Sequence, residues 1–309
     1  MMNHVFKKCA LVMLVLLIAP QPGPAQAGSS GLAFLKLGVS GRGLAMGDAM
    51  SGIVSGAAAT YYNPAGLLGF SSTSSAQLMF MHKEWIQDTR VEYLGSSIHM
   101  DSDNAIGFSL NSTTVSDIEI RTRPGTAEGS FTARNFSLGA SYAHAFAEDL
   151  RVGITGRFLY QKILVDESSG FGFDAGAQYQ TGIEGITVGA VVANMGSMAG
   201  LRGGKTVLPS LVRVGPAFSA RLESLRSAFV LAGDYLYIFP EKNSYLNTGG
   251  EFAFDEVVAA RLGYQFGSEG RGFSGGVGVS YGIFLLDYAY THLNEDLGNT
   301  NTFSLALNF

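Results

Sequence analysis

The sequence has almost no cysteine and few charged residues. Of its 309 residues, Cys9 is the only cysteine, and 15% are Asp, Glu, Lys or Arg. A soluble domain usually carries about a quarter charged residues. Cys9 lies in an N-terminal targeting segment, so the mature chain is expected to have no disulfide, cysteine nucleophile or thiolate metal site. The net charge of −5 becomes −7 when Lys7 and Lys8 leave with that segment, and no nucleic-acid partner is indicated.

The N-terminus is typical of an export signal. Lys7 and Lys8 provide its positive start, residues 10–19 its apolar stretch, and Ala25-Gln26-Ala27 a cleavage site of small residues. The apolar stretch is about half the roughly 20 residues that a membrane-spanning helix needs, so a retained anchor is the weaker alternative. We therefore expect residues 1–27 to be a signal peptide.

No second apolar run is long enough for a membrane-spanning helix, and apolar and polar residues alternate instead from residue 75 to the end. The last segment is the clearest, with Phe303, Leu305, Leu307 and Phe309 on one face and polar or small residues between them. A closed barrel satisfies every backbone polar group within lipid, and short alternating segments are its signature. The sequence therefore predicts an all-β protein, an antiparallel transmembrane β-barrel of the outer membrane.

We predict fourteen strands, an even number as in bacterial single-chain barrels. Residues 117–121 are left open as part of a long loop or an extension of the third strand. A soluble β-sandwich or ligand-binding barrel is the alternative architecture. The predicted strands are 75–82, 90–99, 104–112, 134–146, 150–164, 170–180, 186–194, 209–220, 227–239, 244–254, 257–266, 272–281, 283–291 and 300–309.

The predicted links alternate in length along the chain. Links that follow even-numbered strands are short and polar, whereas the long links, among them 113–133 and 195–208, follow odd-numbered strands. Short periplasmic turns and longer outer loops are the rule for such barrels. Both chain ends are therefore expected in the periplasm, in the outer membrane of a Gram-negative-type bacterium.

The segment before the strands is too rich in small residues to form a core and too apolar for a solvated linker. Its Asn63-Pro64-Ala65-Gly66 step has turn chemistry, because Asn bonds nearby backbone and Pro fixes its own φ. We predict that residues 28–72 form an N-terminal plug inside a barrel of residues 73–309. The plug motif comprises Arg42, Gly43, Gly47, Asp48, Asn63, Pro64, Ala65 and Gly66.

The run from Phe34 through Arg42-Gly43-Leu44-Ala45-Met46-Gly47-Asp48 to Asn63-Pro64-Ala65-Gly66 resembles the opening of PorV/PorQ-type outer-membrane proteins. More distantly, it is similar to the plug of FadL-type transporters of hydrophobic compounds. The PorV/PorQ resemblance implies binding of the C-terminal domains of secreted proteins for type IX secretion and surface attachment. Phe309, an aromatic residue that ends an alternating strand, resembles the signal read by outer-membrane assembly machinery. No catalytic residue, cofactor or metal is implied.

Seven charged residues fall on the inward phase of their strands. An unpaired ion in a poorly hydrated lumen costs several kcal/mol, so we expect these charges to be paired. They either form a structural network that holds the plug, with Arg42 and Asp48 as plug-side partners, or line a polar path or gate. The seven are Arg157, Asp174, Arg213, Asp234, Glu251, Arg261 and Asp287.

Inward glycines and apolar plug residues are the remaining candidates. Gly172, Gly176, Gly276 and Gly278 either leave room for an inserted segment or are sites of curvature. A hydrophobic pocket where plug meets barrel would use Phe34, Leu35, Leu44 and Met46. The histidines show no metal-ligand spacing, and no serine has the motif of a hydrolase, so we expect neither a metal site nor an enzyme.

Three functions remain open for this architecture. A secretion accessory would bind secreted C-terminal domains and secretion-system components. A FadL-like transporter would bind a hydrophobic small molecule, and a porin would keep a continuous wet path past the plug. In each case the barrel wall contacts outer-membrane lipid. The PorV/PorQ resemblance favours the secretion accessory, with the transporter as the alternative.

Overall fold

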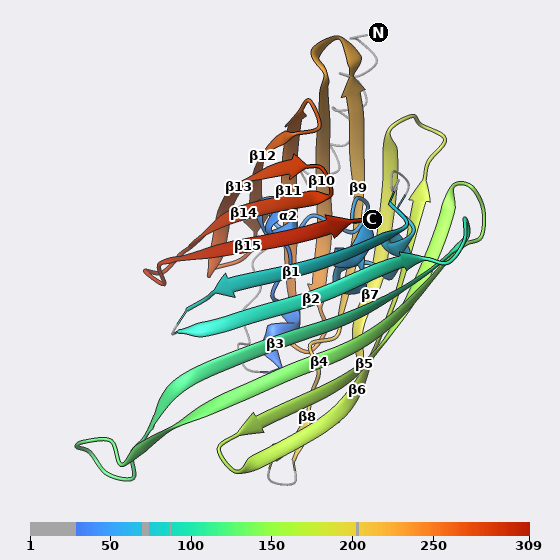
Figure 1. The fold of residues 1–309 in the computed structure, drawn as a ribbon. Helices are drawn as coiled ribbons and strands as arrows, with labels where there is room; N and C mark the ends of the chain where they lie inside the picture. The colour runs from blue at the N-terminus through green and yellow to red at the C-terminus, as the bar shows by residue number, and fades with distance from the viewer. Residues whose placement is uncertain (1–28, 70–73, 87, 202–203) are drawn as a thin grey trace.

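The computed structural model describes residues 29–69, 74–86, 88–201 and 204–309. Fourteen antiparallel strands form one closed ring, because β1 pairs with β15 and β6 pairs with β7 (Figure 1). A two-residue strand, β8 (Lys205–Thr206), pairs with the end of β7. The ring consists of β1 Ala76–Glu84, β2 Thr89–His99, β3 Asn104–Ile120, β4 Gly129–Ala145, β5 Leu150–Ile163, β6 Asp166–Gln180, β7 Ile186–Ala199, β9 Leu211–Leu222, β10 Ser227–Ile238, β11 Asn243–Phe254, β12 Val258–Phe266, β13 Arg271–Tyr281, β14 Phe284–Leu293 and β15 Asn299–Asn308.

The predicted barrel is confirmed, and the main differences concern strand length. Residues 117–120 lie within β3, whose pairing with β4 is irregular between Val115 and Ile118, so they are an extension of that strand. The predicted long loop 113–133 is therefore mostly a β-hairpin. The predicted loop from residue 195 is likewise strand as far as Ala199.

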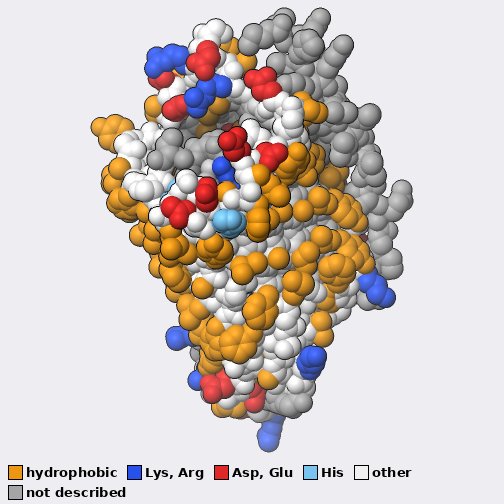
Figure 2. All heavy atoms as spheres, turned by 90° about the vertical axis from the view of Figure 1, so that its right-hand side faces the viewer, with side chains coloured by type: hydrophobic (Ala, Val, Ile, Leu, Met, Phe, Trp, Pro, Cys, Tyr) orange, Lys and Arg blue, Asp and Glu red, His pale blue; other side chains and the backbone are white. Residues whose placement is uncertain are grey.

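The strands carry their apolar side chains outward and their polar side chains inward. In β15, Thr302 and Ser304 are buried, whereas Phe303 between them is 52% exposed. The same arrangement recurs around the ring, and Figure 2 shows apolar side chains over the middle of one face, with most charged side chains near its two ends. An outward face that is apolar around the ring suits contact with lipid. The alternative architecture, a soluble β-sandwich, is therefore wrong.

Residues 29–69, here called the inserted segment, lie inside the ring. They form five short helical pieces: η1 Ala33–Lys36, α2 Gly41–Ala45, η2 Gly56–Ala58, α3 Ala59–Tyr62 and η3 Pro64–Leu67. The α2 helix contacts β12 to β15, whereas η3 contacts β2 to β6. The inserted segment therefore reaches from one wall of the barrel to the opposite wall.

Within the described residues, no helix is long and apolar enough to cross a membrane.

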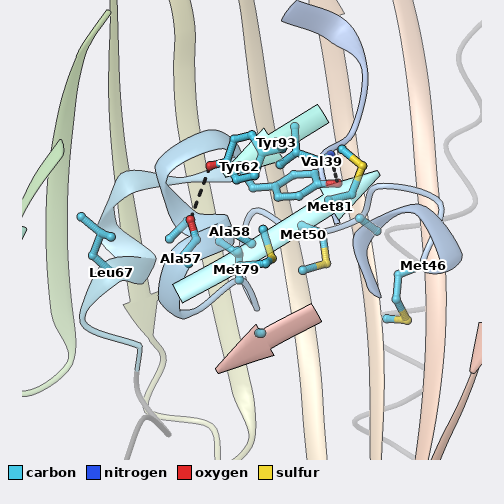
Figure 3. Packing of buried hydrophobic residues seen from close by; sticks show 14 of the residues in the cluster. Val39, Met46, Met50, Ala57, Ala58, Tyr62, Leu67, Met79, Met81 and Tyr93 are labelled. Atoms are coloured by element: carbon cyan, nitrogen blue, oxygen red, sulfur yellow. Dashed lines mark hydrogen bonds between the residues drawn. The ribbon is translucent and has the colours of Figure 1, made fainter. Parts of the chain in front are cut away.

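The main apolar core lies between the inserted segment and the first two strands. Val39, Met50 and Tyr62 of the inserted segment pack with Met81 of β1 and Tyr93 of β2, all almost fully buried (Figure 3). Each fully buried side chain of this size contributes about 1.5–3 kcal/mol by leaving water. Apolar packing therefore helps to hold the inserted segment against the barrel wall.

Candidate functional site

Local hydrogen bonds shape the inserted segment. The Ser40 hydroxyl caps α2 by accepting from the Gly43 N–H at 3.0 Å. The Asn63 side chain accepts from the Ala65 N–H at 3.2 Å and caps η3, which Pro64 begins. Its amide nitrogen donates to the carbonyl oxygen of Ala177 in β6 at 3.0 Å. The Asn-Pro-Ala-Gly step therefore makes a turn and also binds the wall.

Arg42 joins the inserted segment to a chain of charges on the wall. Its Nε and Nη2 atoms donate to the two oxygens of Glu251, both at 2.8 Å. Arg261 donates to the same carboxylate at 2.5 Å and to Asp287 at 2.7 Å. Bidentate arginine–carboxylate pairs are among the strongest hydrogen-bonded contacts in proteins. The four charges alternate in sign across α2, β11, β12 and β14.

Asp48 makes a second charged contact. Arg271, the first residue of β13, forms an ion pair with one oxygen, and the Tyr62 hydroxyl donates to the other at 2.7 Å. Burial opposes ionisation of this carboxyl, but Arg271 and the Tyr62 hydroxyl together hold the pKa of Asp48 below its ordinary value. Asp48 is therefore a carboxylate at neutral pH and fixes the turn after α2 to β13.

Two further acidic residues of the wall contact the inserted segment directly or through arginine. Asp234 accepts from the backbone N–H groups of Met50 and Ser51, both at 2.9 Å. Asp174 accepts from Arg157 at 2.6 and 2.8 Å, and Arg157 also donates to the Thr60 carbonyl at 2.7 Å. Both sides of the segment are thus bound by buried charge.

All seven charged residues that the sequence places on the inward face are buried. Six of them form the contacts above, and Arg213 of β9 is the exception. Its guanidinium lies over the Tyr62 ring, 5.5 Å from the ring centre. In the described part of the chain it forms no ion pair, and its Nε atom is enclosed without a hydrogen-bond partner.

Wall glycines let the backbone of the inserted segment approach closely. A Cβ atom added at Gly176 would lie 2.1 Å from the Asn63 side chain, and one at Gly276 would lie 2.7 Å from Ala45 Cβ. Gly278 instead lies against the side chains of Arg261 and Asp287. Gly172 has only ordinary contacts. The sequence analysis did not single out Gly249 and Gly263, where an added Cβ atom would lie 2.4 and 2.2 Å from backbone atoms of Met46 and Gly47.

A pocket of about 260 Å³, here called the Arg213 pocket, lies between the inserted segment and the wall. It is lined by the cationic residues Lys83, Arg213 and Arg271 and by apolar side chains that include Leu44 and Trp85. Lys83 ends near the Gly38 carbonyl, to which its ammonium donates at 3.1 Å. The sequence analysis missed Lys83 and Arg271, which lie one residue outside the predicted strands 75–82 and 272–281.

The four residues predicted to form one hydrophobic pocket lie in three separate clusters. Phe34 and Leu35 pack with Leu159, Met198 and Leu208. Leu44 lines the Arg213 pocket and packs on Ala289, whereas Met46 belongs to the main core of Figure 3. Of the four, the structure brings Leu44 to the Arg213 pocket and Leu35 to a smaller cavity beside Arg157 and Arg213.

A second hollow of about 600 Å³ is lined by a different part of the inserted segment, residues 52–55. Its other walls include Gln178 and Gln180 of β6 and Arg221, beside the short links. The Arg213 pocket instead includes Trp85 and Leu297 from the opposite links. The inserted segment therefore has a cavity toward each end of the barrel.

The chain ends and possible metal ligands complete the site residues. The Phe309 backbone accepts from the Ser75 N–H at 2.8 Å and donates to the Ala76 carbonyl at 2.9 Å, while its side chain is exposed. Among the described residues, no three His, Cys, Asp or Glu side chains are grouped to hold a metal ion.

The fold is a closed, fourteen-stranded antiparallel β-barrel with a short helical segment before the strands, and it is similar to the folds of hydrocarbon channels and of a FadL homologue. CymD, a monoaromatic hydrocarbon channel, superposes with a TM-score of 0.67 at 14% identity, over 91% of this chain and 99% of that chain. The Pseudomonas putida toluene transporter TodX gives 0.60 at 12% identity, over 87% and 96%. A Pseudomonas aeruginosa FadL homologue gives 0.53 at 12%, over 87% and 97%.

At these identities the likeness establishes the fold alone. No protein-family model matches the sequence, and no curated protein sequence does.

Proposed function

We propose that this protein is an outer-membrane channel for small hydrophobic compounds, with residues 28–72 as its plug. The observation that carries the proposal is the Arg213 pocket, a cavity partly lined by apolar side chains against the inserted segment. A concave, mostly apolar site with a few polar groups is the usual form of a small-molecule site. The transporters TodX and TbuX and the channel CymD, whose folds it shares, are described as proteins of toluene or monoaromatic hydrocarbons.

Passage requires the plug to shift, because it lies between the two cavities. Its polar contacts with the wall, such as the ion pairs of Arg42 and Asp48, are separate from one another. Each can break without the others, whereas the barrel strands are joined by hydrogen-bonded ladders. We therefore assign the movement to residues 28–72 and a fixed wall to residues 73–309. The fold is typical of non-enzymatic channels, and we assign no catalytic residue.

Direct transport measurements test this proposal. Liposomes with the purified, refolded protein should take up toluene faster than empty liposomes. A variant that lacks residues 29–69 should lose selectivity and admit polar sugars. If the intact protein admits sugars as readily as the deletion variant, it is a porin and the proposal is wrong. Mass spectrometry of native protein extracted in detergent would identify a retained lipophile.

The PorV/PorQ-type secretion role is the second candidate, and the β3–β4 hairpin favours it. Beyond Val115 and Arg134 these strands pair only with each other, because the ladders to β2 and β5 have ended. Free strand edges can accept a strand from a partner, such as the C-terminal β-domain of a secreted protein. Co-purification of such a domain, lost when residues 117–131 are replaced by a short turn, would support this role.

The same proposals place the protein in its cell. Residues 1–27 act as a signal peptide, and both chain ends face the periplasm. Phe309, at the end of the last strand, serves as the assembly signal. Deletion of Phe309 should lower the amount of folded barrel in the outer membrane, whereas deletion of residues 122–127, in the link between β3 and β4, should not.

A further inference from the structure

The Arg213 pocket has more positive than negative charge. Four basic side chains line it (Lys36, Lys83, Arg213 and Arg271), and two carboxylates oppose them, Asp48 and Glu241. Glu241 is bound by Lys36 and Ser30, and Asp48 by Arg271 and Tyr62. Asp234, whose charge also acts on Arg213, accepts from the Met50 and Ser51 N–H groups. Arg213 and Lys83 therefore have no carboxylate of their own among the described residues.

Buried hydrogen-bond donors around the same pocket also lack partners. The Nε atoms of Arg213 and Arg271 and the Nδ2 atom of Asn247 are buried and make no hydrogen bond. The Asn247 oxygen is already used, because it accepts from Gln265 at 2.8 Å. Buried polar groups are nearly always paired, so each such group calls for an explanation. The Thr291 Oγ1 atom of the same lining is also buried without a partner, so the polar groups around this pocket are not all satisfied within the described part of the protein.

The size of the pocket limits what can bind there. The volume of about 260 Å³ is below the usual range for drug-sized ligands, about 300–1,000 Å³. Trp85, Ile86 and Leu236 supply apolar and aromatic surface for the rest of the molecule. A small apolar body therefore suits this pocket better than a long alkyl chain.

We propose that the Arg213 pocket binds a small carboxylate with an apolar body, aromatic or short-chain. Arg213 and Lys83 hold the carboxylate, and the apolar wall near Trp85 holds the body. This inference rests on the proposed channel function and names its substrate class. It predicts that an anionic ligand binds more tightly than a neutral hydrocarbon of the same size, because an uncharged ring leaves the excess positive charge of the pocket uncompensated.

Trp85 provides a direct readout, since it is the only tryptophan of the chain and lines the pocket. The full-length protein in detergent is titrated with phenylacetate and with phenylacetamide, which have the same shape but differ in charge. Phenylacetate should bind about 10- to 100-fold more tightly, the usual effect of hydrogen bonds to a charged group. Equal affinities would overturn the proposal.

Variants assign the effect to the guanidinium. Arg213→Gln should weaken phenylacetate binding at least tenfold and change phenylacetamide binding less than twofold, and Arg213→Lys should restore part of the preference. Arg226→Gln, at an exposed site beside the opposite links, is the matched control and should change neither. Slower migration of the unheated barrel on a detergent gel would show that a variant has misfolded. In that case Lys83→Gln takes its place, with the same expected loss.

Two further ligands separate the outcomes. If toluene quenches Trp85 and phenylacetate does not, the channel proposal stands and the carboxylate inference is wrong. If neither binds, the carboxylate inference is wrong, and the channel proposal loses the pocket observation on which it rests. Palmitate that displaces phenylacetate with higher affinity would overturn the size limit.

Discussion

Replacing Gly249 with alanine should loosen the inserted segment, whereas the same change at Gly250 should not. Gly249 of β11 pairs across the ladder with Gly263 of β12, and the Met46–Gly47 backbone lies on this pair. A Cβ atom at Gly249 would be 2.4 Å from the Met46 carbonyl oxygen and 2.9 Å from its Cα. These are backbone atoms, so no side-chain rotation relieves the overlap.

The neighbouring residue is a matched control. A Cβ atom at Gly250 would meet the Leu231 side chain at 3.6 Å, an ordinary contact distance. Overpacking of a tight contact costs about 1–3 kcal/mol, and a surface change away from such contacts stays within about 0.5 kcal/mol. Gly249→Ala should therefore lower the free energy of unfolding by about 1–3 kcal/mol relative to Gly250→Ala.

Two measurements test this difference. Urea unfolding in detergent micelles gives the loss in stability, and single-channel recording in planar bilayers reports whether the plug is displaced. Gly249→Ala should show more frequent openings than the wild type, and Gly250→Ala should not. Equal stability and equal opening frequency in the two variants would refute the idea that the glycine pair seats the Met46–Gly47 turn.

Three further changes address the polar contacts. Arg42→Gln leaves Glu251 with Arg261 alone, so the free energy needed to open the inserted segment to a protease should fall by about 1.5–3 kcal/mol. Arg221→Gln is the exposed control. An unchanged cleavage rate in Arg42→Gln would contradict the role of the pair. Asp48, whose pKa is lowered in the folded state, should stabilise the seated plug above its unfolded pKa of about 3.9. This stabilisation should vanish as the pH falls through the lower pKa that Asp48 has in the folded state. Asp48→Asn should open the channel at neutral pH and remove that acid transition. If the acid transition persists in the variant, another group causes it. Tyr62→Phe removes the hydroxyl that bonds Asp48 and should cost about 1 kcal/mol in urea unfolding, with Tyr235→Phe, a half-exposed tyrosine of β10, expected to have no effect.

Much of the barrel is readable from the sequence because lipid imposes a strict rule on each strand. Phe303, Leu305 and Leu307 face outward and alternate with buried residues. Such a two-residue period can be recognised in the sequence without knowing how the side chains pack. The rule weakens where a strand leaves the apolar layer. Residues 113–120 of β3 carry polar side chains on both faces and an irregular register, so their pattern is that of a loop.

The site was less predictable. Inward charges follow from the alternation, so the buried positions of Arg157, Asp174 and Glu251 could be anticipated. Which charge pairs with which cannot be read from the sequence, because pairing depends on the register of strands far apart in the chain. The missing carboxylate partner of Arg213 and the pocket that Lys83 and Arg271 share cannot be read from the sequence either, because both arise only when the ring is closed.

The seam between the first and last strands joins the two halves of the wall that hold the inserted segment. It consists of eight residue pairs between β1 and β15, and Phe309 is hydrogen-bonded to Ser75 and Ala76. The partners of η3 lie on β2 to β6, and those of Arg42 and Asp48 lie on β11 to β14. A seam that opened would let these two groups of strands separate, so the strength of the β1–β15 ladder also limits how far the inserted segment can leave its seat.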